Sequence, residues 1–195
     1  MGETITQRDV LPLNVYRSRR EEYLRKMIEY KGNRRVRLGE YMTLLFENRQ
    51  TVLFQIQELV HCEDLTAEDE LSEYIDIYSG MLPAENELSA TLFIEIDDQR
   101  KLEEALVKLK GIEHHLQLKV GDEAIQAVFE EIHDDREFTT SVHYLKFPLS
   151  QTAVSYLKSH NAEDVGLVLV LNHPHAVAET RLPAVTVESL QNDLK

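Results

Sequence analysis

The segment from Tyr41 to Glu58 constrains the fold more than any other part of the chain. Its first half, Tyr41–Glu47, is apolar on both faces, which predicts a central strand. Asn48 is a natural N-cap for the amphipathic helix that follows. The carboxylate of Glu47, the amide of Asn48 and the guanidinium of Arg49 therefore stand where apolar residues crowd both sides. Burying such groups without partners costs about 1–3 kcal/mol each, so we expect them to be enclosed and to satisfy one another.

The sequence leaves two roles open for this junction. In the structural one, Glu47 and Arg49 form a charged pair that holds the basic side of the first helix to the sheet. In the functional one they line a pocket, and Arg49 binds an anion at the helix N-terminus. His143, on a strand predicted over 142–147, is the further candidate for that pocket. The candidate ligand-binding residues are thus Glu47, Asn48, Arg49 and His143, and no residue can be given a catalytic role.

The remaining periodicity predicts an α+β fold. A helix that ends at Gly32 is followed by a hairpin with its turn at Gly39-Glu40, and residues 88–171 read β-α-β-(β)-β-α-β. This order is close to a ferredoxin-like arrangement with an added strand. We expect a single domain over residues 1–195, in which a helix, hairpin and two-helix part (1–85) packs on an α+β part (86–195). Its sheet would be mainly antiparallel with helices on one face.

Charge is distributed unevenly along the chain. The formal net charge of −14 argues against a nucleic-acid-binding protein, whose domains usually carry a basic surface. Residues 17–37 nevertheless hold nine basic residues against three acidic ones. The favoured interpretation is a solvated helix face. The alternatives are contact with phosphate or nucleic acid, or an acidic partner protein.

Cysteine content and hydropathy predict a cytoplasmic protein. Cys62 is the only cysteine, so an internal disulfide or a cysteine-based zinc cluster is excluded. The longest apolar run, Val165–Leu171, is far shorter than the ~20 residues that span a bilayer. Residues 1–8 contain no apolar stretch of the signal-peptide type. We therefore expect a reducing compartment and no membrane contact.

Eight histidines raise the question of a metal site. His173 and His175 are two residues apart, which places both imidazoles on one side of an extended chain. Imidazole suits zinc, iron or copper, but a site needs three or four ligands. Either His143, or His133 with Asp134 and Asp135, would complete the site. The alternative is a surface loop in which Pro174 fixes the bend.

Several segments of the chain resemble a known family. These are Arg35–Gly39, Leu44–Arg49 and Thr51–Glu58, together with the opening Ile5-Thr-x-x-Asp9-x-Leu-Pro12 and the strand Ser141–Phe147. They are similar to a bacterial family of uncharacterised proteins, domain of unknown function 3501. The resemblance implies no reaction. Because genes of this family occur beside those of rubrerythrin-like di-iron proteins and iron–sulfur oxidoreductases, it implies an accessory role in redox or oxidative-stress metabolism.

Three hypotheses on function follow. The first is a non-catalytic accessory protein without a cofactor, which associates with itself or with a redox partner protein through its aromatic, basic N-terminal half. The second is a small-ligand-binding protein or enzyme with a pocket around Glu47, Arg49 and His143. The third is a metal-binding protein that uses His173 and His175.

Overall fold

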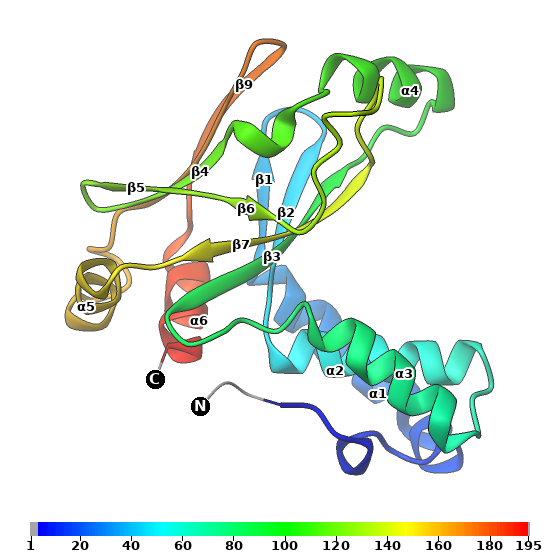
Figure 1. Ribbon diagram of the computed structural model, residues 1–195. Helices are drawn as coiled ribbons and strands as arrows, with labels where there is room; N and C mark the ends of the chain where they lie inside the picture. Colours follow the sequence, from blue (N-terminus) through cyan, green and yellow to red (C-terminus); the bar gives the residue numbers. More distant parts are fainter. Residues whose placement is uncertain (1–3, 195) are drawn as a thin grey trace.

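The computed structural model describes residues 4–194 and contains two antiparallel sheets with helices around them (Figure 1). Residues 1–3 and Lys195, which fall within the predicted domain, lie outside the described residues. The helices are η1 (Gln7–Asp9), α1 (Leu13–Gly32), α2 (Arg49–Cys62), α3 (Glu68–Ser79), α4 (Gln99–Lys108), η2 (Ile112–His114), α5 (Gln151–Ser159) and α6 (Ala184–Asp193). The strands are β1 (Arg35–Leu38), β2 (Met42–Glu47), β3 (Glu87–Ile94), β4 (Leu116–Val120), β5 (Glu123–Gln126), β6 (Val128–Phe129), β7 (Val142–Pro148), β8 (Leu167–His173) and β9 (Ala176–Arg181).

The α+β prediction is confirmed, and the strands differ from the expected arrangement in one respect. They divide between a five-stranded sheet in the order β1-β2-β3-β7-β6 and a four-stranded sheet in the order β5-β4-β8-β9. In the ferredoxin-like pattern, β3 and β7 would be parallel neighbours in one sheet with β4 and β8. Instead β3 pairs antiparallel with β7, and β4 pairs antiparallel with β8. Element order alone does not decide strand pairing, because either arrangement buries the same apolar faces.

The central strand of the first sheet forms where its apolar pattern predicted. β2 lies between β1 and β3, and Asn48 caps α2 by accepting hydrogen bonds from the backbone N–H groups of Gln50 (3.0 Å) and Thr51 (3.2 Å). The turn before β2 contains Gly39 with φ of +70°, a conformation that glycine adopts without strain. The prediction of a hairpin followed by an N-capped helix is therefore confirmed.

Two hydrophobic cores hold the molecule together. The larger contains side chains from both sheets and from α5 and α6, including Phe46, Phe147 and Leu169. The smaller lies among the N-terminal helices, where Val52, Ile56 and Ile75 are buried. In Figure 1, α1, α2 and α3 gather at one end of the first sheet, while α4 lies at the other end. In the described residues, no helix combines the length and the apolar character needed to cross a membrane.

Candidate functional site

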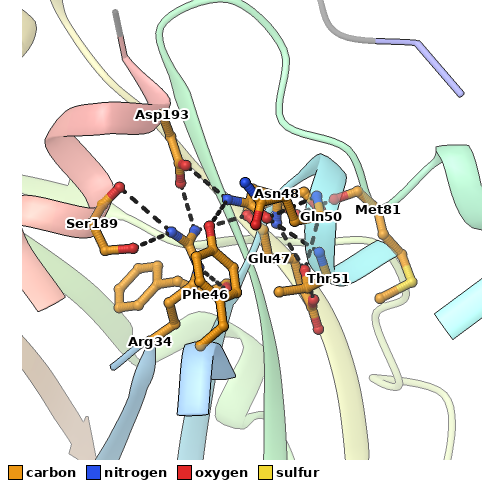
Figure 2. Close-up of polar contacts among 11 residues, drawn as sticks. Arg34, Phe46, Glu47, Asn48, Gln50, Thr51, Met81, Ser189 and Asp193 are labelled. Carbon is orange, nitrogen blue, oxygen red and sulfur yellow. Dashed lines mark hydrogen bonds and ion pairs between the residues drawn. The ribbon is translucent and has the colours of Figure 1, made fainter. Parts of the chain in front are cut away.

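Glu47 is enclosed at the end of β2 and bonded to hydroxyl groups. Its side chain is 3% exposed. Thr91 Oγ1 on β3 donates to Oε1 at 2.7 Å, and Thr51 Oγ1 on α2 donates to Oε2. Figure 2 shows Glu47 beside Thr51 within a network of polar contacts. Both carboxylate oxygens are thus satisfied without a cation.

Asn48 joins the start of α2 to the end of the chain. Beyond its capping role, its amide nitrogen donates to Asp193 Oδ1 at 2.8 Å and to the Tyr30 hydroxyl at 2.6 Å. Asp193 is the last residue of α6 (Figure 2). The side chain therefore connects α1, α2 and α6 at one point.

Arg34 is a buried member of this network that no sequence pattern predicts. It is fully buried, and its guanidinium donates to Asp193 Oδ2 (2.5 Å), Ser189 Oγ (2.8 Å) and the Phe46 carbonyl (2.8 Å). It belongs to the basic run interpreted as a solvated helix face, and for this residue that interpretation is wrong. No signal in the sequence separates Arg34 from the exposed Arg35 beside it, because both belong to the same basic run.

Arg49 does not pair with Glu47, so the prediction that these two side chains satisfy each other is wrong. Its Nη2 donates to Asp9 Oδ1 at 2.5 Å, and its Nε donates to the Thr4 carbonyl at 3.1 Å. Residues on either side of a helix cap point in different directions, so adjacency in sequence did not bring the two charges together. Arg49 instead fastens the N-terminal segment to α2.

His143 lies on the opposite face of the first sheet from Glu47. Cross-strand partners share a face, and His143 is paired with Leu92, which is paired with Leu44 in the larger core. Glu47 is on the other face, that of Thr91. The structure therefore does not bring Glu47, Arg49 and His143 into a common pocket.

His173 and His175 also do not form the expected site. His173 Nε2 is 2.9 Å from the Lys110 carbonyl, and its Nδ1 accepts from the His175 backbone N–H at 3.1 Å. Both ring nitrogens of His173 are thus used by backbone groups, and neither is left for a metal. His175 is exposed in the tight connection between β8 and β9, as in the surface-loop alternative.

A different cluster brings three buried ligand-type side chains together: Glu113 in η2, His133 in the β6–β7 loop and His143 on β7. One ligand atom from each lies within 4.8 Å of the others, and the side chains are only 3–4% exposed. The two imidazole rings are 5.9 Å apart between centroids. The loop that carries His133 is anchored where the Thr139 N–H donates to the Leu106 carbonyl at 3.1 Å.

One carboxylate oxygen of this cluster has no hydrogen-bond donor. Thr139 Oγ1 donates to Glu113 Oε1 at 3.0 Å and lies 3.2 Å from His143 Nε2. The direction of the contact between Thr139 Oγ1 and His143 Nε2 is set by which ring nitrogen carries the hydrogen. Glu113 Oε2 is the one buried side-chain nitrogen or oxygen without a partner in the part of the chain that the structure describes. Glu113 therefore has a hydrogen-bond donor on one carboxylate oxygen and none on the other.

The surroundings of His143 favour its neutral form. Burial lowers the pKa of this imidazole, while the negative charge of Glu113 and a hydrogen bond to the Thr140 backbone raise it and only partly compensate. Neutral imidazole is the form of histidine that binds metals.

A small cavity of about 120 Å³ opens beside the two histidines. Its wall includes His133 and His143 together with Glu130, Glu131 and Tyr144. The cavity reaches the cluster on the imidazole side, because Glu113 is not part of its lining.

Two members of this cluster, His133 and His143, are predicted metal ligands, but with other partners. His133 and His143 were the residues expected to complete a site on His173 and His175. No pattern in the sequence marks Glu113 as a site residue, since it precedes two histidines in a short connection. Only the fold brings it near His133 and His143, which follow it by 20 and 30 positions. Asp134, also expected there, is instead 2.9 Å from His114 near the surface.

Comparisons with known proteins identify a family for this chain, but they give no activity. The model of a family described as "Protein of unknown function (DUF3501)" matches residues 4–194. A crystal structure of a novel protein of unknown function from Burkholderia pseudomallei K96243 is similar over 99% of this chain and 100% of that one, with a TM-score of 0.90 and 31% identity. A comparison with curated proteins found no match.

Proposed function

Because the chain belongs to the DUF3501 family of proteins of unknown function, we propose a function from its own geometry: it binds one divalent transition-metal ion through Glu113, His133 and His143. The observation that carries the proposal is the buried Glu113 Oε2, which has no hydrogen-bond donor beside two buried imidazoles. Leaving such an oxygen unpaired costs about 1–3 kcal/mol and more when it is charged. A bound cation offsets that cost.

The donor set indicates the kind of metal. Two imidazoles and one carboxylate are the ligands of many iron(II) sites, and a similar set holds catalytic zinc. Calcium and magnesium prefer oxygen ligands throughout. Iron or zinc is therefore the expected occupant. The accessory role in redox metabolism that the family resemblance implies is compatible with iron held in this way.

The test compares metal binding with the stability of the metal-free protein. Chelator-treated protein is dialysed against cobalt(II), zinc(II) or, without oxygen, iron(II), and the metal is measured by elemental analysis. We expect one ion per chain and a higher melting temperature with metal, because binding to the folded state alone stabilises it. Glu113→Gln should abolish both effects, whereas His175→Asn, which changes an exposed histidine outside the cluster, should retain them.

The metal-free Glu113→Gln variant separates this proposal from a purely structural ion pair. If Glu113 only balanced a protonated histidine, replacing it would lower the melting temperature without any metal. If the site is built for a metal, the amide supplies the missing donor and the metal-free variant melts at or above the parent. Equal metal content in the parent and the variant would refute the proposal.

A second candidate role, association with a further copy of the chain, is favoured by exposed apolar side chains. Val128, Ile132 and Phe138 are 57%, 55% and 52% exposed, and all three belong to β6 or to the loop that carries His133. Clusters of such side chains often mark protein contacts. This surface differs from the aromatic, basic half expected to mediate contacts, where Arg17, Arg20 and other basic side chains are paired within the chain.

The cytoplasm is the proposed location. The free thiol of Cys62 is exposed, which suits a reducing compartment.

A further inference from the structure

The metal site proposed above has an open side, and its surroundings select what can bind there. Three protein ligands leave at least one coordination position of a four- to six-coordinate ion unfilled. The cavity beside the site is bounded by the two imidazoles and not by Glu113. A molecule in this cavity therefore lies against the two imidazoles, on the side of the cluster away from Glu113.

The size of the cavity limits the ligand to a few atoms. Its volume is about 120 Å³. An engineered cavity of about 150 Å³ takes up benzene, so a space of this size suits a molecule of about five heavy atoms or fewer. A sugar or a nucleotide is too large for it.

The charge around the cavity disfavours anions. Glu130 and Glu131 are part of its wall, and no lysine or arginine is. Residues 130–137 contain five carboxylates and only one arginine. Carboxylates near a site repel small anions and have little effect on neutral molecules.

From these three observations, we infer that the metal takes an exchangeable, neutral small molecule of the size of dioxygen, nitric oxide or hydrogen peroxide, in preference to small anions. This inference rests on the proposed function, because without a metal at Glu113, His133 and His143 the cavity offers such a molecule no strong partner.

The experiment uses nitric oxide as the neutral probe and azide as the anionic one. Iron(II)-loaded protein is treated with nitric oxide without oxygen, and the electron paramagnetic resonance spectrum is recorded. We expect the half-integer-spin signal of an iron–nitric oxide adduct at about one per metal. Azide, followed through the visible spectrum of the cobalt(II) form, should bind weakly.

Two variants test the size and charge arguments separately. Val142→Phe enlarges a side chain in the cavity wall and should suppress the nitric oxide signal while metal content stays at one per chain. Glu130→Gln combined with Glu131→Gln should tighten azide binding at least about tenfold and leave nitric oxide unchanged. Glu163→Gln, an exposed carboxylate outside the cavity lining, is the control for both.

The outcomes distinguish the two proposals. Full metal content without a nitric oxide signal would overturn the inference and leave the metal-binding function standing. Azide binding that the double variant does not change would overturn the selectivity for neutral molecules. If no metal binds, the function fails, and the inference fails with it.

Discussion

At the scale of single residues, two buried carboxylates differ in whether both of their oxygens have a hydrogen-bond donor. Glu47 and Glu113 are almost equally buried, at 3% and 4% exposure. Glu47 accepts one hydroxyl hydrogen on each oxygen, whereas Glu113 has a donor for only one. A satisfied buried carboxylate stabilises the fold, while an unsatisfied one beside two imidazoles is suited to a cation.

Glu47→Gln should therefore destabilise the protein more than Arg49→Ala. An amide offers one acceptor where the carboxylate offers two, so we expect a loss of about 1–3 kcal/mol in the free energy of unfolding. Arg49 and Asp9 are both about 30% exposed on their side chains, and a pair in that setting contributes about 1 kcal/mol or less. Urea denaturation followed by circular dichroism measures both, with the exposed Glu85→Gln as control. Equal losses for the two variants would contradict the separate roles described above.

At the scale of elements, polar side chains determine how the N-terminal helices pack. Tyr16 and Arg20 on α1 both bond to Glu58 on α2, with the Tyr16 hydroxyl donating at 2.5 Å and the Arg20 guanidinium donating to both carboxylate oxygens. Tyr16 is 1% exposed, and it is the only buried residue of α1. The helix is therefore held by a charged hydrogen-bond cluster more than by a broad apolar stripe.

This cluster should make the packing of α1 on α2 sensitive to acid. The hydrogen bonds from Arg20 lower the pKa of Glu58, and the hydrogen bond from Tyr16 adds to them against the opposing effect of burial. A lowered pKa in the folded state means that the stabilisation is complete above the ordinary value of 4.5 and is lost as the pH falls through the lower folded value. We expect Glu58→Gln to be less stable than the parent at pH 7, by about 1–2 kcal/mol.

The difference between Glu58→Gln and the parent should shrink as the pH falls below the ordinary value of 4.5 and through the lower folded pKa, because the parent then loses the same charge. Urea denaturation at a series of pH values measures it. Glu63→Gln, an exposed carboxylate just beyond α2, serves as the control and should track the parent throughout. If the difference in the free energy of unfolding stays constant down to pH 3, the charge of Glu58 does not contribute to stability.

For the whole molecule, the junction of β2 and α2 secures both ends of the described chain. Arg49 bonds to Thr4 and Asp9, while Asn48 and Arg34 bond to Asp193 in α6 (Figure 2). The N-terminal part also shares a sheet with the rest, since β2 pairs with β3. The polar residues of this junction therefore connect distant parts of the chain.

The exposed apolar surface of β6 and its loop gives a prediction at the same scale. If a second copy covers Val128, Ile132 and Phe138, the protein will have the mass of a dimer in multi-angle light scattering after size-exclusion chromatography. Ile132→Ser combined with Phe138→Ser should shift it to a monomer. Ile28→Ser, which changes an exposed apolar residue on α1, should leave the mass unchanged. A monomer at high concentration for the unaltered protein would contradict this role.

The sequence by itself determined the local structure: the strand from Met42 to Glu47, the Asn48 cap, and the α+β class, because apolar periodicity and capping act over a few residues. It also indicated Glu47 and His143 as candidate site residues. Only the tertiary structure decided their partners. Strand pairing placed those two side chains on opposite faces of a sheet, and the folding of the β6–β7 loop brought His133 and His143 to Glu113. Contacts between residues far apart in the chain depend on which faces pack together, and no local pattern encodes that choice.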